Sequence, residues 1–353
     1  MPDVPLPAGS ANQFVRIAGL KRYFDVSAPW LVRALENRPR QIVQAVDGID
    51  IEIAKGETFS LVGESGCGKS TVARLLIRLL KPDRGSMVLD GDPVDEPHGI
   101  TINELRRQVQ MVFQDSYASL NPRLTIAETL AFAPKAHGVP AAEARARSRD
   151  LLAKVGLDPN SFADRYPHEL SGGQRQRVNI ARALALSPRL IILDEAVSAL
   201  DKSVEAQVLN LLEDLKREFG LTYLFISHDL NVVRYISDRV LVMYLGEVVE
   251  LGPVDRVWDS PAHPYTQALL AAMPSSDPDR RTETPPISGD PPNPIDPPSG
   301  CRFHTRCPFA EPLCASATPR LTAIDQFGHQ AACYMAIPGS GHSLAPAKGA
   351  DAA

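Results

Sequence analysis

The sequence predicts an α/β protein built on a largely parallel sheet. Two near-continuous apolar runs, at 189–193 and 221–226, have the pattern of strands buried on both faces. Alternating residues at 58–62 predict a further strand, which runs through a glycine-rich loop into a helical pattern at 69–80. A second helical pattern at 204–218 separates the two apolar runs. Strands and helices that alternate in this way indicate a sheet covered by helices.

The remaining elements follow from the same kind of pattern. Residues 1–12 are expected to form a flexible tail, and the alternation at 14–17 and 49–53 predicts two strands with one buried face each. The stretch from about 115 to 187 is mostly helical in pattern, so we expect a helical subdomain inserted into a larger domain that spans 13–258.

Composition changes near residue 259. Prolines crowd residues 260–299, and proline neither donates to a strand ladder nor continues a helix. We therefore expect an extended, wrapping segment within a C-terminal extension at 259–338. The small and polar residues of 339–353 predict a disordered tail.

Overall composition places limits on function. The chain has 353 residues with 44% apolar and 22% charged residues, as in ordinary globular proteins. Its net charge of −5 argues against a dedicated nucleic-acid binder. The sequence has neither a signal-peptide layout nor a window of about 18 apolar residues, so we expect a cytosolic protein. Stable disulfides are rare there, and the five cysteines point to metal binding, catalysis or neither.

A phosphate-binding loop is predicted at residues 63–70, GESGCGKS, which fit the pattern G-x-x-x-x-G-K-[ST] between a strand and a helix. Glycines let backbone N–H groups surround a phosphate, and the helix N-terminus adds positive potential. Lys69 is expected to contact the β and γ phosphates of ATP, and the Ser70 hydroxyl to bind Mg²⁺. The predicted nucleotide-binding residues of this segment are Gly63, Glu64, Ser65, Gly66, Cys67, Gly68, Lys69, Ser70 and Thr71.

Two carboxylates follow the apolar residues of the strand at 190–193. Asp194 and Glu195 would emerge at its C-terminal end, where ligands bind in open α/β sheets. Asp194 is expected to hold Mg²⁺ through water, and Glu195 to orient or deprotonate the attacking water. An apolar strand that ends in two acids is weak evidence alone, but its pairing with the phosphate-binding loop makes it strong.

A second anion site is predicted at residues 170–177, LSGGQRQR. Ser171 would cap a helix, and Gly172, Gly173 and Gln174 would leave the helix N-terminus open to a phosphate. One ATP cannot easily use both sites of a single chain. The alternative is a glycine-flanked helix cap with a basic exposed face.

This segment resembles the signature sequence of ATP-binding cassette (ABC) proteins, and further elements follow in that family's order. Gln114 resembles the Q-loop glutamine, Asp201 the D-loop aspartate and His228 the switch histidine. The resemblance implies that Gln114 touches Mg²⁺ and the attacking water, that His228 contacts the γ-phosphate, and that both act with Glu195 in catalysis.

An aromatic side chain that stacks on adenine is also implied. Tyr23 or Phe24, after the first strand, resembles this residue. We favour Phe24, and core packing is the alternative for either side chain.

The resemblance covers residues 14 to about 255 and implies the fold of a P-loop NTPase ABC cassette. Such a cassette has a RecA-like core, an antiparallel β subdomain and a helical subdomain, followed here by a small irregular C-terminal extension.

Four segments are similar to the oligopeptide and dipeptide importer ATPases, most of all to their F-type subunit. They are DEAVSALD at 194–201, YASLNP at 117–122, SDRVLVMYLG at 237–246 and SPAHPYT at 260–266. Lys202 departs from the pattern, since the family more often has an apolar residue there.

The resemblance implies a peripheral subunit at the cytoplasmic face of the inner or plasma membrane that hydrolyses ATP to energise uptake of di- or oligopeptides. Implied partners are a second ABC ATPase, two transmembrane permeases and, indirectly, an extracytoplasmic peptide-binding protein. ATP on one loop would be completed by the partner's signature segment. Import of another small solute, such as nickel or glutathione, and a soluble ABC ATPase of DNA repair or translation are the alternatives.

The C-terminal cysteines form a quartet with the spacing C-x5-C-x6-C-x18-C, made by Cys301, Cys307, Cys314 and Cys333. Four thiols suit Zn²⁺ or a [4Fe–4S] cluster. Paired C-x2–4-C knuckles, the usual zinc pattern, are missing, and the longer spacing favours a larger cluster. The family resemblance implies a [4Fe–4S] cluster; zinc and no metal are the alternatives.

Overall fold

The computed structural model describes residues 12–273, 289–290 and 292–347. The predicted N-terminal tail therefore lies almost entirely outside the described residues, as do 274–288 of the proline-rich segment and 348–353 of the predicted C-terminal tail.

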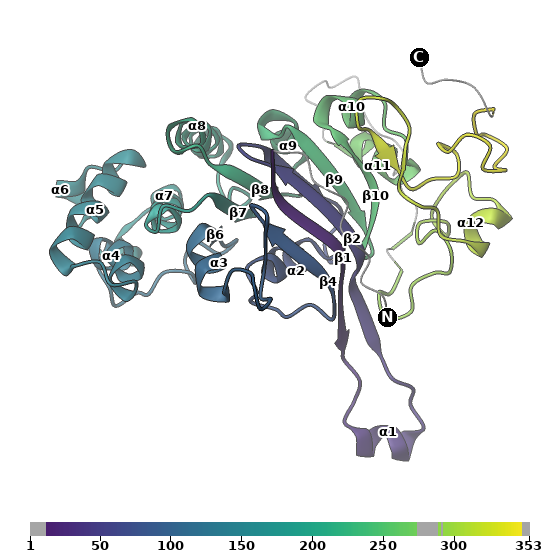
Figure 1. Cartoon of the computed structure of the whole chain (residues 1–353), viewed down its shortest axis with the longest axis horizontal. Coiled ribbons are helices and arrows are strands. Elements are labelled where there is room, and N and C mark those ends of the chain that lie inside the picture. Colours follow the sequence, from purple (N-terminus) through teal and green to yellow (C-terminus); the bar gives the residue numbers. More distant parts are fainter. Residues whose placement is uncertain (1–11, 274–288, 291, 348–353) are drawn as a thin grey trace.

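The centre of the molecule is an eight-stranded sheet in the order β11-β12-β10-β9-β3-β8-β7-β6 (Figure 1). The pairs β3–β8, β3–β9, β7–β8 and β6–β7 are parallel, and every residue of β3, β7 and β8 is buried. This confirms the α/β prediction and its doubly buried strands. The strands are β3 (Thr58–Val62), β6 (Val109–Val112), β7 (Leu190–Asp194), β8 (Thr222–Ile226), β9 (Arg239–Tyr244), β10 (Glu247–Pro253), β11 (Thr322–Ala323) and β12 (Gln330–Ala331).

A second, antiparallel sheet of four strands has the order β2-β1-β4-β5. Its buried side chains form one apolar cluster with the inner face of helix α2. The phosphate-binding loop therefore begins a helix that is packed between the two sheets. The strands are β1 (Gln13–Asp25), β2 (Ile42–Ala54), β4 (Arg84–Leu89) and β5 (Asp92–Pro93).

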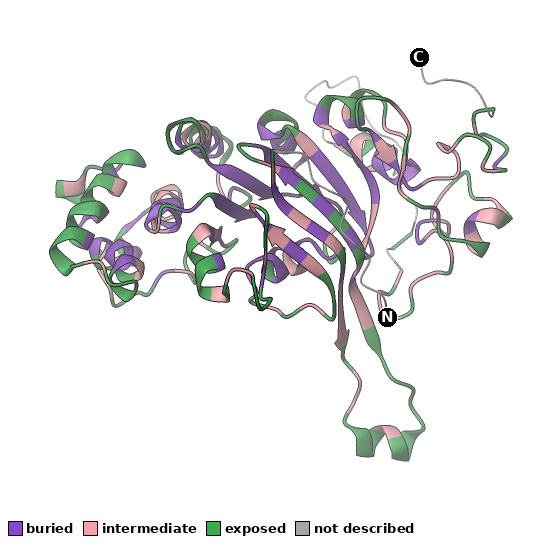
Figure 2. Cartoon of the chain, viewed as in Figure 1, coloured by how far each residue is buried: buried purple, intermediate pink, exposed green. Residues whose placement is uncertain are grey.

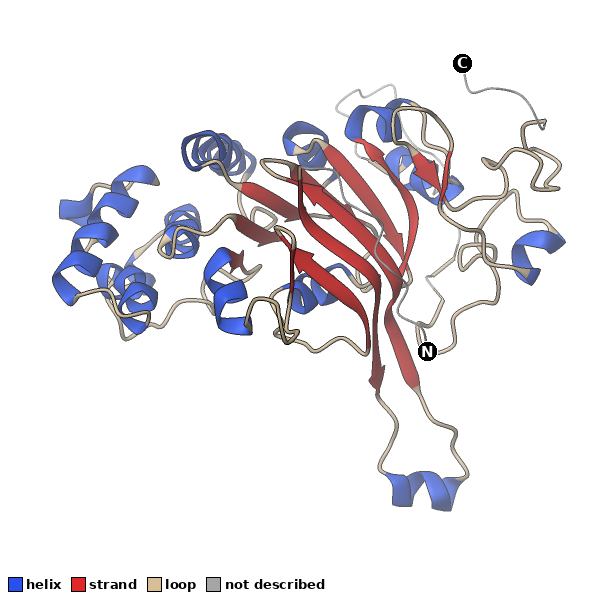
Figure 3. Cartoon of the chain, in the orientation of Figure 1, coloured by secondary structure: helices blue, strands red, loops and turns tan. Residues whose placement is uncertain are grey.

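Helices cover the main sheet and gather at one end of it as the helical region α4 to α7 (Figure 3). The helices are α1 (Trp30–Glu36), α2 (Lys69–Leu76), α3 (Ile102–Gln108), α4 (Ile126–Ala136), α5 (Ala141–Lys154), α6 (Pro159–Phe162), α7 (Gly172–Leu184), α8 (Lys202–Phe219), α9 (Leu230–Ile236), α10 (Val254–Asp259), α11 (Pro264–Ala271) and α12 (Pro312–Ser316), with a 3₁₀ turn at Pro167–Glu169.

Helix α2 is shorter than the pattern at 69–80 predicts. Arg78 takes a left-handed backbone conformation with a φ of +54°, and the N–H groups of Leu79 and Leu80 both donate to the Arg74 carbonyl. These bonds close the helix at its C-terminus, as left-handed caps do. The remaining apolar residues of the pattern belong to the turn that follows.

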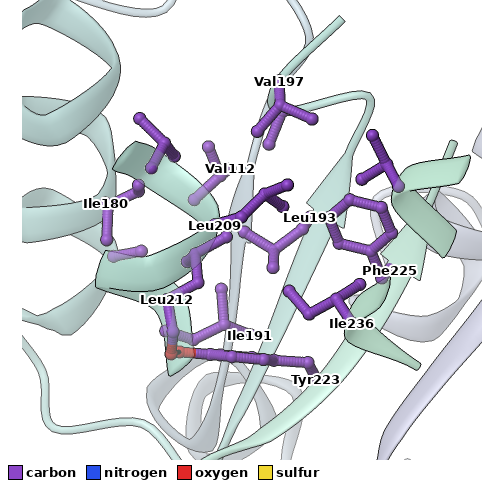
Figure 4. Packing of buried hydrophobic residues seen from close by; sticks show 14 of the residues in the cluster. Val112, Ile180, Ile191, Leu193, Val197, Leu209, Leu212, Tyr223, Phe225 and Ile236 are labelled. Carbon is purple, nitrogen blue, oxygen red and sulfur yellow. Dashed lines mark hydrogen bonds between the residues drawn. The ribbon is translucent and has the colours of Figure 1, made fainter. Parts of the chain in front are cut away.

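The core under the candidate site is formed where α8 packs on strands β7 and β8. Leu209 and Leu212 of the helix pack among Leu193, Tyr223 and Phe225 of the strands (Figure 4). The Tyr223 hydroxyl is satisfied there because it donates to the Leu212 carbonyl at 2.8 Å. This packing fixes the end of β7, from which the two predicted acidic residues emerge.

Strands β1 and β2 extend well beyond the sheet as a hairpin arm that carries α1 at its tip (Figure 2). Helix α1 buries no residue, and Trp30 and Leu35 are 72% and 86% exposed. The sequence patterns did not predict this arm.

The C-terminal extension is joined to the core sheet, because β12 pairs with β10. Buried Glu250 of β10 accepts hydrogen bonds from the N–H groups of Ala262 and His263 and lies 2.7 Å from His329 Nε2. Residues 339–347 also contact the extension: His342 is buried, and its Nε2 lies 2.9 Å from the Phe309 carbonyl oxygen. These residues therefore differ from the disordered tail that the sequence predicts at 339–353. None of the described helices is both long and apolar enough to cross a membrane.

Candidate nucleotide-binding site

The phosphate-binding loop connects β3 to α2 and curls around its own lysine. Lys69 is buried, and its Nζ donates to the carbonyls of Gly63 at 2.7 Å and Glu64 at 3.0 Å. The loop thus surrounds a cation at the N-terminus of a helix, which is the chemistry that phosphate binding requires.

Two positions in this loop need glycine for steric reasons. Gly63 has a φ of +146°, and an added Cβ would lie 2.2 Å from the Met243 carbonyl oxygen. Gly68, which caps α2 with a φ of +112°, would place a Cβ 2.2 Å from the Ala45 carbonyl oxygen. The loop is therefore held tightly between β9 and β2.

A hydroxyl and a carboxylate meet beside the loop. Ser70 Oγ donates to Asp194 Oδ1 at 3.0 Å, which joins the start of α2 to the end of β7. Burial raises the pKa of the Asp194 carboxyl, and the hydrogen bond from Ser70 opposes this. Hydroxyl and carboxylate oxygens are ligands that Mg²⁺ prefers, so this pair fits a magnesium ion.

The three predicted catalytic side chains converge on one point. Gln114 Nε2 donates to Glu195 Oε2 at 2.6 Å, and His228 Nδ1 lies 3.5 Å from Glu195 Oε1. Glu195 has a φ of +49°, a conformation that is uncommon for residues other than glycine. Its N–H donates to the Ile226 carbonyl at 2.9 Å, so β8 holds the strained residue in place.

These groups enclose a cavity of about 460 Å³. It is lined by Ala45, Ser65, Gly66, Gly68, Lys69, Ser70, Thr71, Gln114, Glu195 and His228. A lysine and a helix N-terminus on one side and a glutamate on the other can bind a polyphosphate and activate a water molecule.

Neither predicted adenine-stacking residue lines this cavity. The Tyr23 hydroxyl donates to Asp47 at 2.6 Å, and the Arg22 guanidinium lies 4.8 Å from the centre of the Phe24 ring. The side chain that β2 contributes to the cavity is Ala45. The stacking role of Tyr23 or Phe24 stays a prediction.

The signature residues form the start of α7 and likewise do not line the cavity. Ser171 Oγ accepts the Gln174 N–H at 3.3 Å, and the Gln174 side chain accepts the Ser171 N–H at 3.0 Å. Ser171 is exposed and Gly172 partly so. An added Cβ on Gly173 would lie 2.4 Å from Val204 of α8, so this glycine allows close packing of the two helices. The second predicted anion site is therefore separate from the first.

Asp201, the predicted D-loop residue, caps α8 by accepting the Val204 N–H at 2.9 Å. The neighbouring Lys202 donates to Asp229 at 2.7 Å and to Glu205 at 2.9 Å. The lysine that departs from the family pattern thus ties the start of α8 to the residue after His228.

All four C-terminal cysteines line one pocket, together with Phe303, Phe309 and Met335. Burial raises the pKa of the Cys301 thiol to about 12 and that of Cys333 to about 11. In the described residues no three histidine, cysteine or carboxylate side chains lie close enough to hold one metal ion. The geometry therefore gives no support to zinc or to another single metal ion, and it provides no evidence of a [4Fe–4S] cluster.

Two residues of the extension contact the loop and were not predicted as site residues. The Tyr265 hydroxyl accepts the Glu64 N–H at 2.8 Å, and Arg306 Nη1 donates to Glu64 Oε2 at 2.9 Å. Tyr265 belongs to the segment SPAHPYT at 260–266, which resembles the importer ATPases, but nothing in that segment indicated a contact with a residue 201 positions away.

A parallel sheet with this loop at one strand end, an inserted helical region and a signature helix define an ATP-binding cassette. The family model described as ABC transporter matches residues 46–198, and the model for the oligopeptide/dipeptide transporter C-terminal region matches 249–314.

Relatives match along nearly the whole chain. The oligopeptide transport ATP-binding protein AppF of Bacillus subtilis is 46% identical, covering 94% of this chain and 99% of that protein. OppF of Salmonella typhimurium, of the same description, is 48% identical over 92% and 96% of the two chains. The chain belongs to this family of ABC transporter ATP-binding subunits, and it is an ATPase.

Solved structures agree with this fold. cbiO1 of Clostridium perfringens, part of an ABC transporter complex, has a TM-score of 0.59 at 28% identity, covering 70% of this chain and 92% of that one. An ATP-binding cassette solved as a dimer in a post-hydrolysis state with ADP and Pi has a TM-score of 0.57 at 28% identity, covering 68% and 98%.

Proposed function

We propose that this subunit hydrolyses ATP to energise the uptake of di- or oligopeptides. The observation that carries the proposal is the match to oligopeptide transport ATP-binding proteins, which includes the C-terminal extension as well as the cassette. The earlier alternatives, import of nickel, glutathione or another small solute, would use the same ATPase chemistry.

In the proposed mechanism ATP binds with its phosphates on the loop, at Lys69 and the N-terminus of α2. Mg²⁺, held by Ser70, Asp194 and Gln114, would neutralise charge that develops on the phosphates. Glu195 orients or deprotonates the attacking water, and its hydrogen bond with Gln114 supports the orientation of its carboxylate. His228, on the opposite side of Glu195, contacts the γ-phosphate.

The site is completed by a second cassette. Ser171, Gly172, Gly173 and Gln174 lie outside this chain's own cavity, and their helix N-terminus is open to solvent. We propose that it binds the ATP held by a partner, with Asp201 beside it, while the partner's signature segment completes the site described here. Binding would close the pair and hydrolysis would release it.

The proposed assembly contains a second, non-identical ATPase and two transmembrane permeases, supplied by an extracytoplasmic peptide-binding protein. This places the chain at the cytoplasmic face of the membrane as a peripheral subunit. The test is transport into proteoliposomes that contain the assembled complex. Peptide uptake that needs ATP and is lost in Glu195→Gln supports the proposal; uptake of nickel or glutathione but not of peptides would contradict it.

We also propose that Cys301, Cys307, Cys314 and Cys333 hold a [4Fe–4S] cluster. The support is the spacing of the four cysteines in the sequence, together with the fact that all four line one pocket whose remaining wall is largely apolar. The cluster would tie together a segment too small to build its own core. Absorbance near ~400 nm that is lost in Cys307→Ser is expected; a folded, colourless, iron-free anaerobic preparation would contradict the proposal.

A further inference from the structure

One acidic residue of the phosphate-binding loop is held from outside the cassette. The Glu64 carboxylate accepts two hydrogen bonds from Arg306, from Nη1 to Oε2 at 2.9 Å and from Nη2 to Oε1 at 3.2 Å. The guanidinium is buried, with 7% of the side chain exposed. The Glu64 side chain is 24% exposed, so the contact is partly buried. A two-pronged contact between an arginine and a carboxylate is among the stronger charge-assisted interactions in proteins.

The backbone of the same residue is held by Tyr265. The Tyr265 hydroxyl accepts the Glu64 N–H at 2.8 Å, and the tyrosine is completely buried. Its ring packs 4.6 Å from that of Tyr244 and 5.4 Å from that of Phe303. The hydroxyl therefore cannot move away from the loop without disturbing an aromatic cluster.

The opposite side of Glu64 is held by the phosphate-binding lysine, since Lys69 Nζ donates to the Glu64 carbonyl at 3.0 Å. The orientation of the loop around Glu64 is thus fixed by three groups. Two of them, Tyr265 and Arg306, come from the extension, and Lys69 comes from the loop itself.

Electrostatics gives the arginine a second effect. A carboxylate in a loop that binds a polyphosphate repels its ligand, and this repulsion is strong in a partly buried site. Arg306 neutralises Glu64 and draws its side chain out of the nucleotide cavity, which Glu64 does not line.

We propose that Arg306 and Tyr265 are positioning residues for ATP, through which the C-terminal extension sets the nucleotide affinity of this subunit. The inference rests on the proposed function only in requiring that ATP binds at this loop. It gives the extension a role in the chemistry of the cassette that is independent of any metal.

The first experiment compares Arg306→Ala with Arg320→Ala in the assembled complex. Arg320 is exposed in the same extension, so its variant is a matched control. We expect MgATP binding, followed with a fluorescent ATP analogue, to be roughly tenfold weaker in Arg306→Ala, as the loss of a charge-assisted bond predicts. The control should bind within about twofold of wild type.

A second variant separates positioning from mere stability. Adding Glu64→Gln to Arg306→Ala removes the unpaired carboxylate, so ATP affinity should recover at least threefold, while the thermal unfolding temperature measured without nucleotide need not recover. Equal ATP affinity in wild type and Arg306→Ala, or no recovery in the double variant, would overturn the proposal.

Tyr265→Phe gives an independent test if Arg306→Ala does not fold. It keeps the ring and removes only the oxygen that accepts the Glu64 N–H, so ATP binding should weaken several-fold; unchanged binding would overturn the role of Tyr265. If the wild-type complex itself binds no ATP, the proposed function fails. If the wild-type complex binds ATP and the Arg306 and Tyr265 variants bind it equally well, the positioning role of these two residues fails while the proposed function stands.

Discussion

Glu195→Gln removes a charge and a base with almost no change in shape. Glutamine has the size of glutamate, and its amide oxygen can accept the same hydrogen bond from Gln114 that now spans 2.6 Å. His228, 3.5 Å away, loses no close contact. The substitution therefore isolates the chemical role of the carboxylate.

The expected size of the effect follows from that role. A positioned general base contributes about 10²–10⁴ in rate, which corresponds to about 3–5 kcal/mol in the activation barrier. ATP binding should be retained or become tighter, because one negative charge beside the phosphate cavity is removed.

The assay is phosphate release by the assembled complex, measured alongside equilibrium ATP binding. Glu213→Gln, a charge change on α8 outside the cavity, is the control and should hydrolyse ATP like wild type. Turnover in Glu195→Gln that stays within threefold of wild type would refute the assigned role of this residue.

Three further predictions concern other parts of the site and its surroundings. In Gly63→Ala the new Cβ would lie 2.2 Å from the Met243 carbonyl oxygen, and overpacking of this kind costs about 1–3 kcal/mol. ATP binding, measured in equilibrium titrations, should therefore weaken by roughly tenfold or more. An affinity near that of wild type would contradict this. Lys202→Leu should lower the free energy of unfolding by about 1 kcal/mol or less, because the lysine side chain is 77% exposed; a loss above about 2 kcal/mol in urea unfolding would show a larger role for its pair with Asp229. Burial lowers the pKa of His263 from 6.5 to about 4. Between pH 6.5 and pH 4 the unfolded chain therefore binds a proton at this histidine that the folded chain does not bind. Stability should therefore fall by about 3 kcal/mol as the pH drops from 6.5 to 4, and His263→Gln should reduce this slope; identical slopes in urea unfolding would contradict the assignment.

The sequence was most informative where function is encoded in contiguous residues. The phosphate-binding loop needs glycine at fixed positions. The strand that leads to Asp194 and Glu195 is recognised by the four apolar residues that precede these two acids. Such patterns can be read without knowing the fold. Gln114 and Glu195 are 81 residues apart, and their shared place at the attacking water followed only from the family resemblance; the hydrogen bond between them was not predicted.

The sequence was least informative about contacts between distant segments. Arg306 and Glu64 are separated by 242 residues, and neither has a neighbour that indicates the pairing. The hairpin arm escaped prediction because α1 buries none of its residues and so lacks a clear apolar face toward the core. The packing of 339–347 was missed because small and polar residues there are held by specific bonds, such as that between Ser343 and Glu311.

The proposed mechanism depends on hydrolysis of ATP between two cassettes, each of which supplies its signature segment to the ATP bound by the other. The most direct test is ATP turnover per chain measured across a dilution series, with the oligomeric state followed by mass photometry. If each site needs two cassettes, turnover per chain should fall in step with the loss of paired cassettes. Undiminished turnover in samples that contain only single, separated cassettes would contradict it.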